Sequence, residues 1–162
     1  MSKIVQIIEW LQECPELTNI LSIAGTEDSG NTVILPQGAS PLTSHRESVD
    51  VYGNYHCDII PYPSYYEDFQ INCYAQYDPQ DESDPAENTN ILNYQDVENI
   101  CTWIANKNIN NELPIITGKK VVSVECNPPI PQIRYVNNTE GIIAYFVTLR
   151  IRYVNTHPEL SR

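Results

Sequence analysis

The stretch IIAYFVTLRIRYV, residues 142–154, decides the fold. Every second side chain in it is apolar, and this set is Ile143, Tyr145, Val147, Leu149, Ile151 and Tyr153. Arg150 and Arg152 fall on the other face. Alternation with a period of two is typical of a strand with one buried face. We therefore predict that residues 142–154 form the longest strand of the protein.

Two further segments, Val49–Ile59 and Phe69–Tyr77, alternate in the same way. The sequence PYPSYY, residues 61–66, lies between them and is short enough to connect antiparallel strands. These segments therefore predict a hairpin with a tyrosine-rich connection.

Shorter elements are expected on both sides of this hairpin. The apolar runs 20–24 and 32–35 flank the turn-forming sequence TEDSGN (26–31) and predict a small extra hairpin. Residues 37–47 resemble a loop.

Two short strands are expected before the last one. Lys119–Cys126 predicts a strand that ends at Asn127-Pro128-Pro129, and Ile133–Val136 predicts a second, shorter strand. The turn-forming sequence NNTEG, residues 137–141, leads into the last strand.

Two segments have helical periodicity. Near the N-terminus the apolar stripe is Ile4, Ile7, Ile8 and Leu11. Ser2 is placed to cap this helix, and Pro15 ends it near Cys14. In the second helix the stripe is Val97, Ile100, Cys101 and Ile104, with Trp103 beside it. Asn93 and Asp96 resemble a capping box, and the helix fades within Asn106–Asn111, before Pro114.

The order of elements predicts an α+β fold in a single domain, residues 1–162. We expect an antiparallel or mixed sheet of about four main strands, two helices on one face and the small extra hairpin. The sequence DPQDESDPAENT, residues 78–89, is acidic and almost free of apolar residues. It predicts a solvated, mobile loop.

Composition excludes several classes of partner. The formal net charge is −12, which disfavours binding to nucleic acid or to anionic lipid. Neither a membrane span nor a signal peptide is recognisable, so we expect a protein that is made and assembled in a cytosol. The five cysteines include no CxxC pair and predict reduced, structural thiols: Cys14, Cys57, Cys73, Cys101 and Cys126.

The sequence shows no recognisable catalytic or cofactor motif. His56 and Cys57 are neighbours on a predicted strand, so their side chains point to opposite faces and cannot form a dyad. The acidic residues of 78–89 do not have the spacing of a calcium loop. We predict no enzyme activity, no cofactor and no metal site.

Tyrosines in the predicted hairpin connection are the strongest candidates for a functional surface. Tyr62, Tyr65 and Tyr66 either fold back on the sheet edge or contact another protein, since tyrosine supplies contact area at low entropic cost. We also assign Asp78, Asp81 and Asp84 of the acidic loop to this candidate protein interface.

Four stretches together resemble the tail-terminator and minor capsid proteins of phages and prophages of Gram-positive bacteria. They are WLQECPEL (10–17), Asp68–Ala75, Trp103-Ile104 with Leu113-Pro114, and Ala144–Tyr153. The resemblance implies a ring, usually a hexamer, that ends the tail tube and presents a surface to the head connector. It implies no catalytic residues. The chain departs from the family pattern in the 78–89 loop and in its 12 prolines.

The expected partners follow from this resemblance. They are further copies of the chain, the tail tube protein and a head–tail connector or neck protein, with DNA passing through the lumen without specific binding and no membrane contact. The expected location is the tail or neck of the virion, after assembly in the host cytoplasm. The alternatives are a head-completion or neck adaptor, a small cytosolic protein-binding adaptor outside a phage, and an enzyme that uses scattered carboxylates.

Overall fold

A computed structural model describes residues 2–17, 21–23 and 30–155, with the backbone alone for 21–23, 40–48, 57–63 and 155. The elements in chain order are α1 (Lys3–Leu11), the short 3-10 helix η1 (Pro15–Leu17), β1 (Leu21–Ile23), β2 (Thr32–Val49), β3 (Tyr55–Gln76), α2 (Thr89–Ile109), β4 (Lys119–Cys126), β5 (Gln132–Asn137) and β6 (Ile142–Asn155).

The four main strands form an antiparallel sheet in the spatial order β2-β3-β6-β4. Strand β1 extends the sheet beyond β2, and β5 pairs with β6. Strands β4 and β5 share one edge of β6, because β4 pairs with its C-terminal half and β5 with its N-terminal half. The predicted α+β class is confirmed.

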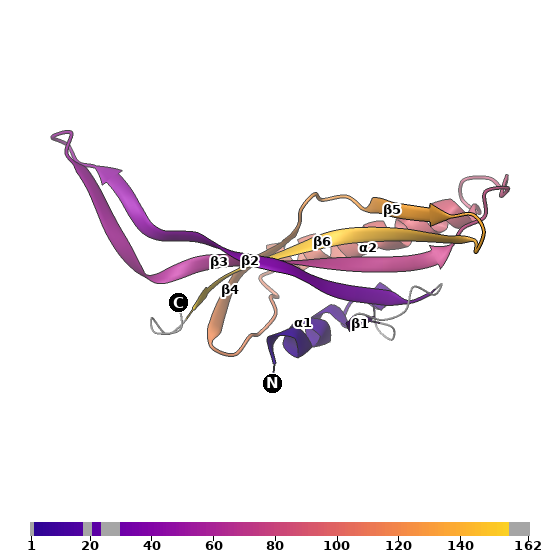
Figure 1. Ribbon diagram of the computed structural model, residues 1–162, viewed down its shortest axis with the longest axis horizontal. Coiled ribbons are helices and arrows are strands. Elements are labelled where there is room, and N and C mark those ends of the chain that lie inside the picture. The colour runs from indigo at the N-terminus through magenta and orange to yellow at the C-terminus, as the bar shows by residue number, and fades with distance from the viewer. Residues whose placement is uncertain (1, 18–20, 24–29, 156–162) are drawn as a thin grey trace.

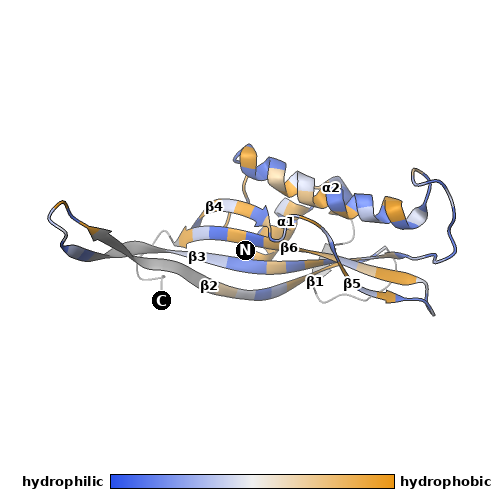
Figure 2. Ribbon diagram, turned by 90° about the horizontal axis from the view of Figure 1, so that it is seen from above, coloured by the Kyte–Doolittle hydropathy of each residue, from blue (hydrophilic) through white to orange (hydrophobic). Residues whose placement is uncertain are grey.

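Both helices lie on the same face of the sheet (Figure 2). Their apolar stripes meet the alternate residues of β3 and β6, including all six predicted side chains of the last strand, in one main core. The Trp10 and Trp103 rings contact each other at 4.8 Å between centroids and join α1 to α2. The Trp10 Nε1–H also donates to the Glu112 carbonyl at 2.9 Å, so the buried indole is satisfied.

Helix α1 begins as predicted at Ser2, whose Oγ accepts from the Val5 N–H. Helix α2 begins earlier than predicted, and the proposed capping box of Asn93 and Asp96 is wrong. The cap is Asn88, whose Oδ1 accepts from the N–H groups of Asn90 and Ile91. Asn93 lies inside the helix, where its amide donates to the Gln76 carbonyl at 2.8 Å.

The main hairpin is displaced from its predicted position. The segment 49–59 is not one strand, because β2 ends at Val49 and β3 begins at Tyr55. The predicted connection, residues 61–66, lies inside β3 instead of at a turn. The alternation of apolar residues continues across the five-residue turn at 50–54, so it does not reveal the turn. Pro61 and Pro63 do not end β3, because prolines are tolerated in a strand where the ladder is irregular.

Two other predictions near the N-terminus are also corrected. Residues 37–47 are not a loop, since they belong to β2 and pair with β3. The described part of the first apolar run, Leu21–Ile23, does not form a hairpin with the second, because β1 pairs with β2 in parallel, with Leu21 opposite Thr32 and Ile23 opposite Ile34. The first four residues of the turn expected at 26–31 lie outside the described residues. A period of two identifies the buried face of a strand and carries no information on its direction.

The later elements agree with the sequence. Strand β4 has its predicted bounds, and β5 extends one residue beyond its prediction at each end. Residues 138–141 form the turn between β5 and β6, where the Glu140 N–H donates to the Asn137 side chain. Gly141 has φ +65°, a backbone conformation that favours glycine.

The face of the sheet opposite the helices holds a second, small cluster of Val33, Tyr74 and Ala144. Asn72 of β3 is fully buried beside it, with Val33 and Phe146 as its neighbours on adjacent strands. Neither polar atom of the Asn72 amide has a hydrogen-bond partner within the described part of the chain. A buried amide without partners destabilises the folded state.

We expect Asn72→Val to raise the free energy of unfolding by about 1–3 kcal/mol, because it removes the desolvation penalty of an unpaired amide. Urea unfolding followed by circular dichroism measures the change. Gln70→Val is the matched control on the same face of β3, and its half-buried amide predicts a smaller effect. A lower stability of Asn72→Val would contradict the expectation.

Candidate assembly surface

Strands β2 and β3 continue past the rest of the sheet as a two-stranded arm, residues 43–64. The pairing of β3 with β6 ends at Ser64, opposite Val154, whereas β3 begins at Tyr55. The segment between Tyr55 and Ser64 spans roughly 30 Å at the usual rise of a strand. Figure 1 shows the arm leaving the body at the end opposite the loop that precedes α2.

The arm is bent at irregular positions of its ladder. The register shifts at three places in β2, between Pro36 and Gly38, between Pro41 and Thr43, and between Thr43 and His45. At the last shift, residues 60–63 of β3 stand opposite Ser44 alone, because Thr43 pairs with Ser64 and His45 with Ile59. Bulges bend and twist a strand, which accounts for the change of direction in Figure 1.

Asp50 organises the turn at the end of the arm. Its Oδ1 accepts from the N–H groups of Tyr52 at 2.8 Å and Asn54 at 3.0 Å. Its Oδ2 lies 3.0 Å from His56 Nε2, and this hydrogen bond is the main reason that the pKa of Asp50 is lowered. Gly53 has φ +82° and completes the turn.

The tip of the arm, residues 49–55, exposes large apolar side chains. Val51 is 93% exposed and Tyr52 86% exposed, and Val49 and Tyr55 are also exposed. An isolated two-stranded ribbon is marginally stable in water, and contiguous exposed apolar side chains mark contact sites. The arm therefore has the properties of an element that binds another protein chain.

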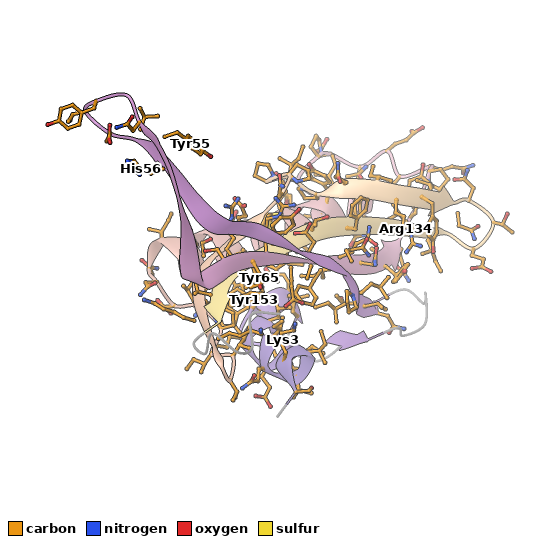
Figure 3. The ribbon with its side chains drawn as sticks, turned by 60° about the vertical axis from the view of Figure 1, so that its left-hand side comes forward. Lys3, Tyr55, His56, Tyr65, Arg134 and Tyr153 are labelled. Atoms are coloured by element: carbon orange, nitrogen blue, oxygen red, sulfur yellow. The ribbon has the colours of Figure 1, made fainter. Side chains whose placement is uncertain are left out.

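A network of side chains anchors the base of the arm to the body (Figure 3). The Tyr65 ring stacks on the Tyr153 ring at 5.9 Å, and the Tyr153 hydroxyl donates to Glu67 at 2.6 Å. Lys3 forms an ion pair with the same carboxylate. Burial, followed by the bond to Glu67, raises the pKa of Tyr153. Lys119 lies 4.5 Å from the centre of the Tyr153 ring, and burial lowers its pKa.

Tyr66 points to the other face of the sheet. The Arg150 guanidinium lies 4.0 Å from the centre of its ring and binds both carboxylate oxygens of Asp68, at 2.8 and 3.0 Å. Tyr65 and Tyr66 therefore do not form one surface, and the Tyr65 side chain folds back on the sheet. The backbone of Tyr62 lies in the irregular part of β3, and its side chain lies outside the described residues.

The acidic members of the predicted interface lie at the far end of the molecule from the arm. Asp78 Oδ1 accepts from Gln80 N–H, and the two oxygens of Asp81 accept from Ser83 and Thr89 N–H. A hydrogen bond from the Ser83 side chain, followed by the backbone bonds from Thr89 and Ser83, lowers the pKa of Asp81 to about 2. Asp84 is exposed. The structure therefore does not bring the tyrosines and the acidic loop together, and the mobility of this loop stays a prediction.

Sequence reasoning missed the tip of the arm, although a signal was present. The sequence DVYGN, residues 50–54, combines Asp, Gly and Asn, which are common in turns. The alternating pattern of residues 49–59 runs through this turn sequence and predicts a strand in its place. A turn in that position places Val51 and Tyr52 in solvent and not on a sheet.

Two of the grooves in the described part of the body lie beside α2. A groove of about 530 Å³ lies between η1, the ends of β2 and β3, and the first half of α2. Glu16 and Asp96 are its carboxylates, and burial together with the charge of Glu16 raises the pKa of Asp96. Cys73 also lines this groove, and burial raises its pKa to about 12, so the thiol is protonated at neutral pH. A second groove of about 410 Å³ lies between α2 and β4.

Within residues 2–17, 21–23 and 30–155, no three His, Cys, Asp or Glu side chains gather in a way that would hold a metal ion. Neither α1 nor α2, the α-helices of that part of the chain, is long and apolar enough to cross a bilayer.

The chain was also compared with known proteins. No protein-family model matches the sequence, and no curated protein matches it significantly.

We expect Asp50→Ala to loosen the tip, because the turn loses its acceptor for two N–H groups and its contact with His56. Limited chymotrypsin digestion should then cut after Tyr52 several-fold faster. Asp50→Asn keeps the Oδ1 acceptor and is the control, with cleavage close to that of the parent protein. Equal rates for all three proteins would show that Asp50 does not hold the turn.

The same carboxylate predicts the pH dependence of the tip. Because the folded-state pKa of Asp50 lies below its ordinary value of 3.8, the ionised form stabilises the turn. The stabilisation of the turn by ionised Asp50 is complete above the ordinary pKa of 3.8. It is lost as the pH falls through the lowered pKa of Asp50 in the folded protein. Amide exchange of Tyr52 and Asn54, followed by NMR, should lose protection in that acidic range.

Proposed function

We propose that this protein is a structural virion protein, a tail terminator that forms a ring at the end of the tail tube and joins it to the head connector. The observation that carries the proposal is the arm. Its tip presents Val51 and Tyr52 to solvent about 30 Å from the last pairing with β6, within reach of a neighbouring subunit. The resemblance of residues 10–17, 68–75, 103–104 with 113–114, and 144–153 to phage tail terminators supplies the biological role.

A ring requires head-to-tail contacts, in which one surface of a subunit meets a different surface of the next. The arm suits such a contact because it projects from one end of the body, where it is anchored by the Tyr65–Tyr153 stack and the Lys3–Glu67 ion pair. An anchored base and an apolar tip allow the arm to reach over a neighbour while the body keeps its orientation.

The negative charge supports the second part of the proposal. A net charge of −12 repels the DNA backbone, so acidic residues around a lumen would let DNA pass without adhering. A ring structure with a basic lumen would overturn this part of the proposal and leave the assembly role intact.

The arm also fits the runner-up, a head-completion or neck adaptor, since such a protein must contact two different rings. A cytosolic adaptor outside a phage is the remaining structural alternative, and it would act as a monomer that captures one partner. An enzyme would place its chemistry in the groove that is lined by Glu16 of η1 and Asp96 of α2.

Native mass spectrometry of the purified chain tests the proposal. A hexamer of 18.5 kDa chains has a mass of about 111 kDa. We expect this species, and we expect the double variant Val51→Ser, Tyr52→Ser to shift the protein toward the monomer. Ile115→Ser is the matched control, because Ile115 is 86% exposed and lies outside the arm.

The alternatives give different outcomes in the same experiment. If the parent protein and both variants are monomers, and stay monomers when tail tube protein is added, the terminator role is wrong. If the parent is a hexamer and the arm variant is an equally stable hexamer, the ring is formed by another surface and the role of the arm is wrong.

A further inference from the structure

Helix α2 and strand β4 meet along the groove of about 410 Å³, and two cysteines line it. Cys101 lies on the buried stripe of α2, and Cys126 is the last residue of β4. Cys101 belongs to the main core, and the half-buried Cys126 packs against that core. The two elements are held in register by the Asn108 side chain, whose Oδ1 accepts from the Val124 N–H at 2.9 Å.

The Cys101 and Cys126 side chains line the same groove, and their interaction lowers the pKa of the Cys101 thiol and raises that of the Cys126 thiol. The interaction therefore favours a thiolate on Cys101 and keeps the proton on Cys126. This is the arrangement of a nucleophilic thiol beside a second thiol that can resolve a mixed disulfide.

The other described cysteines have different surroundings. Cys14 is fully buried and Cys73 is half-buried, and burial raises the pKa of each thiol to about 12. Both are therefore protonated at neutral pH and react slowly. Cys14, Cys73, Cys101 and Cys126 are all free thiols in the structure.

We propose that Cys101 and Cys126 form a dithiol site that a small-molecule disulfide oxidises to an intramolecular disulfide, joining α2 to the end of β4. The groove beside them is open at the surface and is lined by Ile109, Pro129 and Ile130. Cys101 is 7% exposed and Cys126 is half-buried, so this groove is the route by which a small reagent approaches the pair.

The reaction takes place in two balanced exchanges. The Cys101 thiolate attacks one sulfur of the small disulfide, a mixed disulfide forms, and the first small thiolate leaves. Cys126 then loses its proton and attacks the Cys101 sulfur of the mixed disulfide, which releases the second small thiolate. The protein loses two hydrogens and two electrons, and one small disulfide becomes two small thiols.

Oxidised glutathione is the probe, added to the folded full-length protein in a Cys57→Ser background. This background removes the cysteine of the arm, whose side chain is not described. We expect an intact-mass loss of about 2 Da, since two hydrogens leave. Non-reducing peptide mapping should join the peptides of Cys101 and Cys126, and the melting midpoint should rise by roughly 5–10 °C.

Single-cysteine variants are the controls. With Cys126→Ser we expect one glutathione to stay attached to Cys101, because the resolving thiol is absent. With Cys101→Ser we expect much slower modification, because burial alone still raises the pKa of the Cys126 thiol.

Two outcomes would overturn the proposal. One is a mass that stays unchanged in the folded Cys57→Ser protein while denatured protein reacts. The other is a cross-link that involves Cys14 or Cys73 in place of the proposed pair. Circular dichroism before and after treatment confirms that the protein stays folded in either case.

Discussion

The ladder between β3 and β6 is the constraint on which the rest of the structure depends. Thirteen residue pairs, from Ser64–Val154 to Gln76–Ile142, join the two strands without a register shift. Because side chains alternate along a strand, this unbroken register places one alternating apolar set on the face that the helices cover, namely Phe69 and Ile71 of β3 and the six residues of β6 from Ile143 to Tyr153. A slip of one residue would expose that whole set to water.

The two ends of this ladder have different roles. At the Gln76 end, hydrogen bonds of Asn93, Asp78 and Asp81 connect the end of β3 and the acidic loop to the start of α2. At the Ser64 end, β6 stops pairing and β3 continues alone with β2 as the arm. The Gln76 end of the ladder is therefore joined to α2 within the body, whereas the Ser64 end leads into the arm, which is available to other chains.

Most of the body could be predicted from local patterns. The helical stripes around Leu11 and Ile104, the bounds of β4 and the faces of β6 follow from periodicity, because each of these elements buries one continuous face. The candidate site was predicted less well. Tyr65, Tyr66 and the acidic loop were grouped by composition, and the structure separates them because adjacent strand residues face opposite sides and β3 is fully extended.

The sequence by itself determined the α+β class, the buried faces and the lack of a recognisable catalytic motif, since these depend on residue type and short-range spacing. Only the tertiary structure decided where the hairpin turns, that β1 runs parallel to β2, and that Cys101 and Cys126 line one groove. These features depend on strand direction and on contacts between residues far apart in the chain. The period of two is the same on both sides of the turn at Asp50, so the sequence pattern does not show where the arm begins. The arm begins where the pairing of β3 with β6 ends, at Ser64.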